Sequence, residues 1–144
     1  MARVSGIEIQ LRAQRFCKYL RIDRNTRNNI ARFLETLALH AICIDPVDDD
    51  DWIWVTDAIC DPSSFRILIP DSTYVAACKG NQEALGVIFH EIGHLMLSHR
   101  AVLHNNKSAP PCQEEDAEWQ ADRFAAYVIA RMGLAPYGQL SLDF

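Results

Sequence analysis

Residues 83–98 have the sequence EALGVIFHEIGHLMLS, and this stretch decides how the rest of the chain is arranged. Its apolar side chains recur three and four positions apart, which is the spacing of an amphipathic helix. The side chains that we expect to face the core are Leu85, Ile88, Ile92 and Leu95. The sequence therefore predicts a helix over this stretch, and the polar residues within it are the first candidates for chemistry.

Two histidines of this helix, His90 and His94, are four residues apart. At about 3.6 residues per turn they lie about 40° apart in projection, so both imidazoles can reach one divalent ion. Glu91 lies beside them, where its carboxylate can take a proton from water held by that ion. Gly93 lowers helix propensity by roughly 1 kcal/mol relative to alanine, and we infer that another backbone passes close to it.

A zinc ion at such a site needs a third protein ligand and keeps its fourth position for water. The last predicted helix, residues 113–132, offers Glu118 and Asp122 four residues apart, so their carboxylates project together. We expect Glu118 to be the third ligand and Asp122 to hydrogen-bond the second nitrogen of a liganding histidine. Ala121 and Ala125 would let the two helices approach closely. Carboxylates in the first turn of this helix are rival ligands: Glu114, Glu115 and Asp116.

The first forty residues predict two amphipathic helices. Ser5 could cap a helix that runs to about Leu20 and keeps its charged side chains in water. Its inward-facing residues are expected to be Leu11, Phe16, Tyr19 and Leu20. Asn25 or Thr26 could cap the second helix. The apolar residues that recur on this second helix are Ile30, Phe33, Leu34 and Leu37.

The middle of the chain predicts a small sheet. The aspartate-rich segment 45–51, which contains Pro46, is expected to be a solvated loop. Short β-branched and aromatic runs at 52–56 and 65–69 predict two neighbouring strands joined by a loop over 57–64. The predicted fold class is α+β. It comprises two N-terminal helices, a small antiparallel or mixed sheet, the histidine helix and a C-terminal helix with the third ligand, in a single domain.

Composition limits the class of protein. The chain has 144 residues, of which 49% are hydrophobic and 23% charged, so a disordered protein is excluded. No run approaches the roughly 18 apolar residues of a membrane-spanning helix, and we expect no membrane partner. The N-terminal segment has no apolar core of a signal peptide, and the five cysteines are widely separated. We therefore expect a cytoplasmic protein with reduced thiols.

Charge is unevenly distributed along the chain. Residues 1–32 carry eight basic and two acidic side chains, a net charge of +6, whereas the remaining residues carry six basic and 17 acidic ones, a net charge of −11. Such asymmetry is found in surfaces that bind nucleic acid or an acidic partner, but it also describes the wet side of a helix. Since the basic residues alternate with apolar ones at helical spacing, we favour the wet side and expect no specific nucleic-acid partner.

Together, the histidine motif of residues 90–99 and the acidic motif of residues 118–126 resemble those of the ImmA/IrrE family of metallo-endopeptidases. The quoted residues are His90-Glu91-Ile92-Gly93-His94-Leu95-Met96-Leu97-Ser98-His99 and Glu118-x-x-Ala121-Asp122-x-Phe124-Ala125-Ala126. The second motif is also similar to the Glu-x-x-x-Asp helix of the wider gluzincins. The resemblance implies that His90, His94 and Glu118 bind zinc and that Glu91 is the general base. Where the family often continues with a proline, residues 127–132 have none.

The resemblance also implies a biological setting. Such proteins are typically intracellular and relieve repression, often by cleaving a helix-turn-helix repressor. The sequence thus predicts a zinc endopeptidase of narrow specificity for a regulatory protein. The alternative is a non-proteolytic metal-binding module that controls a transcription factor or a stress response. Glu91 favours the enzyme, because a structural zinc needs no general base and usually closes its fourth position. Nucleic-acid binding through the basic first helix would give only weak, non-specific retention.

Two parts of the expected mechanism stay open. A developing oxyanion needs a donor besides the metal, and the sequence does not choose among several candidates. They are Tyr74, Tyr127, Tyr137, His99 and His104. A substrate peptide could add to an exposed strand edge by main-chain hydrogen bonds, and the strand at 65–69 is our candidate for that edge. The substrate, the oligomeric state and the activating trigger are not predicted.

Overall fold

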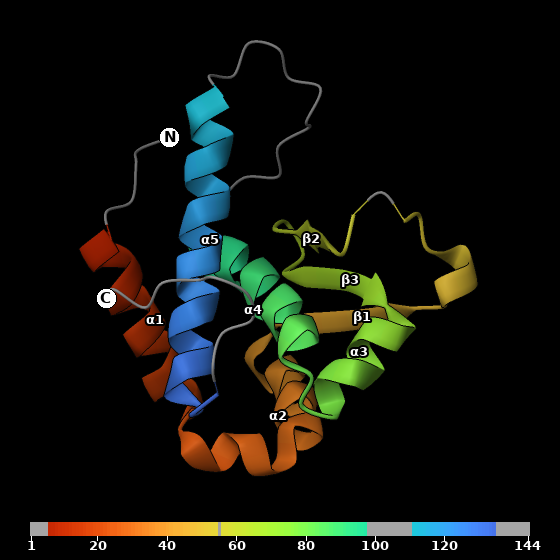
Figure 1. The fold of residues 1–144 in the computed structure, drawn as a ribbon, viewed down its shortest axis with the longest axis horizontal. Coiled ribbons are helices and arrows are strands. Elements are labelled where there is room, and N and C mark those ends of the chain that lie inside the picture. The colour runs from red at the N-terminus through yellow and green to blue at the C-terminus, as the bar shows by residue number, and fades with distance from the viewer. Residues whose placement is uncertain (1–5, 55, 98–110, 135–144) are drawn as a thin grey trace.

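The computed structural model describes residues 6–54, 56–97 and 111–134, and in the last range it describes side chains from 117 onward. Three helices form one half of the molecule: α1 (Gly6–Leu20), α4 (Gln82–Met96) and α5 (Pro111–Arg131). Figure 1 shows α5 between α1 and α4, with the sheet on the far side of α4. The helices meet in a buried core, in which the rings of Phe16 and Phe124 pack edge to face at 5.3 Å.

The inward face of α1 differs from the expected one. Phe16 is buried, but Leu11 is 41% exposed and Tyr19 is 73% exposed, so the prediction for these two residues is wrong. The buried positions are Ile9, Ala13, Phe16 and Cys17. They follow the four- and three-residue spacing of one helix stripe, which is rotated from the predicted stripe. Small residues in that stripe bring α1 close to α5. The proposed cap, Ser5, lies outside the described residues.

The second predicted helix is divided into three short pieces, η1 (Arg24–Asn29), α2 (Ile30–Thr36) and η2 (Leu37–His40). The first begins with a capping box in which Asp23 accepts from the Asn25 backbone and Thr26 accepts from the Asp23 backbone. A second cap follows inside the predicted helix, since the Asn29 side chain accepts from the Arg32 backbone N–H. This internal cap restarts the helix. The apolar positions Ile30, Leu34 and Leu37 are buried as expected.

The sheet has three strands, β1 (Cys43–Val47), β2 (Ile59–Asp61) and β3 (Arg66–Pro70), in the order β1-β3-β2. β1 pairs with β3 in parallel and β2 pairs with β3 antiparallel, so the sheet is mixed and the α+β class is confirmed. The expected edge strand at 65–69 is instead the central strand. The prediction of a substrate edge there is therefore wrong, since both of its edges are already hydrogen-bonded.

Of the strand predicted at 52–56, the described residues 52–54 and 56 are not in a strand, and this prediction is wrong as well. A short helix, η3 (Asp49–Asp51), precedes Trp52, whose side chain is buried and whose indole N–H donates to the Thr56 carbonyl oxygen at 2.9 Å. The segment expected to be a loop contains β1, in which Pro46 is tolerated because an edge strand has N–H groups that need no partner. The hydrophobic residues 52–54 thus belong to a turn in which the Trp52 indole is buried, and not to a strand.

One face of the sheet is covered by helices. Ile67 and Ile69 of β3 are fully buried, and Cys60 of β2 lies opposite Ile67 in the ladder and points to the same side. Helices α3 (Asp71–Cys78) and α4 pack on this side (Figure 1). The other face carries Arg66, which forms an ion pair with Asp45 at 3.1 Å. Among the helices that the structure describes, none has the length and apolar content needed to cross a bilayer.

Candidate metal centre

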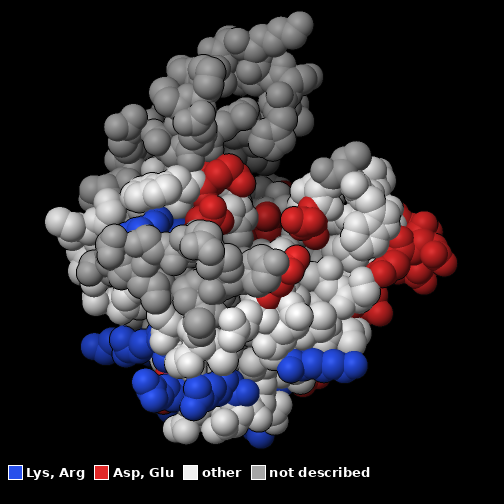
Figure 2. Space-filling model, viewed as in Figure 1, with Lys and Arg blue, Asp and Glu red and all other residues white. Residues whose placement is uncertain are grey.

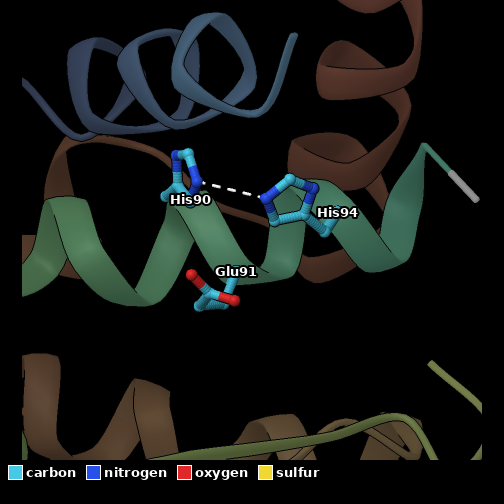
Figure 3. Close-up of side chains that lie close together, drawn as sticks. All are labelled: His90, Glu91 and His94. Atoms are coloured by element: carbon cyan, nitrogen blue, oxygen red, sulfur yellow. Dashed lines mark hydrogen bonds between the residues drawn. The ribbon is translucent and has the colours of Figure 1, made fainter. Parts of the chain in front are cut away.

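The histidine helix forms as predicted and is fixed at its start. The Asn81 side chain accepts from the Ala84 backbone N–H at 2.8 Å, so α4 begins at Gln82. From this end the helix carries His90, Glu91 and His94 into the region beside α5. Figure 3 shows the two imidazole rings facing each other on the side of α4 toward α5, while Glu91 leaves the helix on a different side.

The structure brings the two histidines and Glu118 together. The Nε2 atoms of His90 and His94 are 3.1 Å apart. The Glu118 carboxylate of α5 reaches both rings, with Oε1 3.1 Å from His90 Nε2 and Oε2 3.0 Å from His94 Nε2. Two imidazole nitrogens and the two oxygens of one carboxylate, from two helices, therefore face one another, and each ring contacts a different oxygen.

These nitrogen and oxygen separations are close to the ligand–ligand separations around a tetrahedral metal ion. With ligand bonds of about 2.0–2.2 Å, the edges of a zinc coordination tetrahedron are about 3.3–3.6 Å, so the observed separations need only a small expansion. A second set of three is also compact, because ligand atoms of His90, Glu91 and His94 all lie within 4.8 Å of one another. Glu118 and Glu91 are thus both candidate third ligands beside the two histidines.

Asp122 determines which nitrogen of His90 is available. Its Oδ1 lies 2.7 Å from His90 Nδ1, and since a carboxylate only accepts, the Nδ1–H of His90 donates to it. The neutral ring then has its lone pair on Nε2, which is the atom that faces Glu118 and His94. A carboxylate on the far nitrogen is the usual support of a metal-binding histidine. The neutral ring thus presents this lone pair as a metal ligand does, whereas the protonated ring donates from the same nitrogen to Glu118.

The close contact of α4 and α5 depends on two small residues. A Cβ atom added at Gly93 would lie 3.2 Å from both the Cα and the carbonyl oxygen of Ala121, and 3.2 Å from the Cβ of Phe124. The inference that a backbone passes close to Gly93 is therefore confirmed. Ala121 and Ala125 are both buried, as expected for small residues at a close helix contact. A side chain at position 93 would move Glu118 away from the histidines.

The pKa values of His90, Glu91 and Glu118 depend on one another. Burial works to lower the pKa of His90, but hydrogen bonds to Asp122 and Glu118, with the charges of Glu91 and Asp122, raise it to about 10. The same hydrogen bonds, from His90 and His94, hold the pKa of Glu118 well below its usual range. In the metal-free protein, the proton on His90 supplies the positive charge that a metal ion would supply. Burial raises the pKa of Glu91 above its ordinary value, against the lowering influence of both histidines. Such a shift is typical of a general base.

Two residues near Glu91 were not predicted. Asp57 raises the pKa of Glu91 by its charge, and Glu91 in turn influences Cys60 on β2. Burial, Glu91 and Asp61 raise the pKa of Cys60 to about 12, so its thiol is protonated and is a poor ligand for a metal. No sequence pattern indicated either residue, because a loop and a short strand bring them to α4 from some thirty positions away.

Other candidates are placed less centrally or not at all. Tyr74 on α3 is influenced electrostatically by Cys78 and Glu35 rather than by the histidines. Tyr127 lies nine positions beyond Glu118 on α5, about 14 Å along the helix. The remaining oxyanion candidates lie outside the described residues: His99, His104 and Tyr137. The rival ligands Glu114, Glu115 and Asp116 fall in the part of α5 whose side chains are not described.

The fold and this centre define a coarse class, a mostly helical α+β chain with a group of residues able to hold a metal ion. No protein-family profile, curated protein or solved structure matches the chain. Any more specific function must therefore be argued from the residues themselves.

Proposed function

We propose that the chain is a zinc-dependent endopeptidase in which His90, His94 and Glu118 hold the ion and Glu91 is the general base. One observation supports this most directly: the Nε2 atoms of His90 and His94 lie 3.1 Å apart, each lies 3.0–3.1 Å from a Glu118 carboxylate oxygen, and Glu91 is next to both histidines. A structural site would use its fourth group to close the coordination shell. In this proposal Glu91 does not bind the ion, which leaves a position for water and substrate.

The roles of the chain's own groups follow from their positions. When bound, zinc supplies a Lewis acid and lowers the pKa of water toward neutrality. Glu91 takes the proton of the attacking water and passes it to the leaving amine. Its raised pKa suits both steps, because the group must hold the proton briefly and then release it. Asp122 keeps His90 in one tautomer and orientation, and Gly93 keeps α5 within reach of α4.

A peptide substrate has a place to bind beside this centre. β2 is an edge strand of the sheet, and its residue Cys60 lies near enough to Glu91 to be influenced by its charge. An extended peptide that pairs with the free edge of β2 would receive main-chain hydrogen bonds and pass by Glu91. This edge replaces the one expected from the sequence.

The resemblance to ImmA/IrrE peptidases suggests the substrate class, a regulatory protein such as a helix-turn-helix repressor. The second candidate is a metal-binding regulatory module without proteolysis, controlling a transcription factor or a stress response. It is favoured by the exposure of the Glu118 side chain, 57% of which is accessible, since an open ligand suits reversible metal exchange. The endopeptidase requires the Glu91 carboxylate as its general base, whereas the regulatory module does not.

The decisive experiment is Glu91→Gln, with Glu83→Gln on the exposed side of α4 as its control. Metal content is measured by elemental analysis, and cleavage is measured by mass spectrometry on a peptide library incubated with zinc-loaded protein. We expect both variants to retain one zinc ion and only Glu91→Gln to lose cleavage, by about 10²–10⁴-fold. Cleavage that survives in Glu91→Gln, or a zinc-loaded wild type that cleaves nothing, contradicts the enzyme proposal.

A further inference from the structure

A second surface feature lies in the connection between β1 and β2. We call residues 48–54 the acidic arm. Figure 1 shows that it projects from the sheet at the right-hand edge, on the side away from α5. The arm is anchored rather than loose: Asp49 accepts from the Ser72 backbone N–H at 3.0 Å, and the Trp54 indole N–H donates to the Asp49 carbonyl oxygen at 3.3 Å. Trp52, within the arm, is buried.

The anchored arm displays two large apolar side chains to solvent. Ile53 is 70% exposed and Trp54 is 61% exposed, although they are neighbours of the buried Trp52. Single exposed apolar residues are common, but an adjacent pair on an ordered projection is typical of an interaction surface. Tryptophan in particular is enriched among the residues that contribute most to protein–protein binding.

The surroundings of this pair are uniformly acidic. An open hollow of about 350 Å³ is lined by Asp48, Asp49, Asp71 and Ser72. Asp50 and Asp51 add two exposed carboxylates on η3, and Figure 2 shows the Asp and Glu side chains gathered at this edge. Among the described residues no Lys or Arg forms an ion pair with these carboxylates; the nearby Arg66 is paired with Asp45. The negative charge is therefore available to a partner.

We propose that the acidic arm is a docking surface for a basic segment of another protein. A Lys or Arg side chain of the partner would enter the hollow between Asp48 and Asp71. An apolar side chain, or a second cation, would lie over the exposed indole of Trp54. The charge excludes a nucleic acid or an anionic membrane as the occupant, because phosphate groups would be repelled. A cationic peptide with apolar residues satisfies both the charges and the apolar pair.

This proposal does not rest on the peptidase proposal. The arm follows β1, whereas the metal centre lies on α4 and α5, and α4 packs on the face of the sheet at β2 and β3. Binding at the arm should therefore be the same with and without zinc, and the same in Glu91→Gln protein. Working in the Glu91→Gln background also prevents cleavage of the probe, so failure of one proposal is distinguishable from failure of the other.

The probe is a fluorescein-labelled synthetic peptide in which Lys and Arg alternate with Leu, and its binding is followed by anisotropy at low salt. We expect Trp54→Ala to weaken binding about tenfold and Asp48→Asn about threefold. Matched controls are Tyr19→Ala, another exposed aromatic residue, and Asp61→Asn, which removes the same charge from β2; both should bind as the parent does. Circular dichroism checks that each variant is folded.

A second measurement uses protein without substitutions in the acidic arm. The chain has three tryptophans, and their indole N–H signals in NMR report separately on the arm and on α5. The peptide should shift the Trp54 signal and leave that of Trp119, which follows Glu118, in place. The proposal is overturned if Trp119 responds instead, if Trp54→Ala binds as tightly as the parent, or if a DNA duplex without the peptide shifts the Trp54 signal. Self-association of the protein that Trp54→Ala abolishes would assign the arm to a second copy and overturn it equally.

Discussion

The molecule has two groups of carboxylates that a composition count would treat alike. In the metal centre, Glu118 and Asp122 point at imidazole nitrogens 2.7–3.1 Å away. In the acidic arm, the Asp48 side chain accepts from the Asp50 backbone N–H, and the Asp49 side chain accepts from Ser72. The first set converges on a point between two helices, and the second lies spread over an exposed turn.

The difference shows that convergence, and not the density of acidic residues, identifies a candidate metal site. Lone pairs that face one another need a cation, whereas carboxylates that cap turns are already satisfied and remain solvated. The metal centre is thus expected to be sensitive to single-atom changes. The arm is expected to be tolerant of the same changes, except toward a binding partner.

The strongest test of this contrast removes one carboxylate from each group. Glu118→Gln should reduce zinc affinity by more than about 100-fold, because an amide oxygen is a weak ligand and the site loses one of three. Asp50→Asn in the arm should leave zinc affinity unchanged. Competition with a chromophoric chelator measures both. Equal zinc affinity in Glu118→Gln and the wild type would remove Glu118 from the ligand set.

A smaller effect is expected at the group behind the histidine. Asp122→Asn keeps the shape of the side chain but replaces a charged acceptor of the His90 N–H, and we expect zinc affinity to fall about 10–100-fold. The same chelator assay measures it. Because an asparagine can flip to donate, the variant should also populate the other tautomer of His90, visible in the ¹⁵N shifts of the ring. An unchanged tautomer together with unchanged affinity would exclude a supporting role for Asp122.

The contact between α4 and α5 can be tested with two glycines of one helix. Gly93→Ala places a methyl group 3.2 Å from the Ala121 backbone, whereas nothing lies within 4 Å of a Cβ at Gly86. Both changes gain the same helix propensity, so their difference isolates the contact. We expect Gly93→Ala to be less stable than Gly86→Ala by about 1–3 kcal/mol in urea unfolding, and to bind zinc more weakly. Equal stability of the two variants would mean that the helices can separate freely.

The pH dependence of stability should separate metal-free from metal-loaded protein. The raised pKa of His90, from 6.5 to about 10, stabilises the metal-free fold below pH 6.5, and this contribution is lost as pH rises toward 10. The lowered pKa of Glu118 stabilises the fold above its ordinary value of 4.5 and is lost on acidification. Thermal melts of metal-free protein should therefore peak between about pH 4.5 and 6.5. Excess zinc should abolish the alkaline decline; a metal-free Tm that rises from pH 7 to 9 would contradict this assignment.

The helices of the metal centre were predictable because their side chains follow the periodicity of the α-helix, which depends only on local sequence. The spacing of His90 and His94, and of Glu118 and Asp122, is a property of any helix, and Gly93 with Ala121 indicated where two helices touch. The sheet was less predictable, since the apolar run around Trp52 matches a strand locally but is a turn whose indole is buried. β1 was not predicted, because Pro46 and the aspartates of segment 45–51 are typical of a loop. Proximity of Asp57 and Cys60 to Glu91 depends on strand order, which no local pattern contains.

The ligand atoms of the centre belong to residues 28 positions apart on two separate helices. Any ion held by them would act as a cross-link that closes this loop, so coordination and the association of α4 with α5 would form one equilibrium. The melting temperature would then follow the free metal concentration, and the fraction of assembled protein would become a gauge of the ion available in its surroundings.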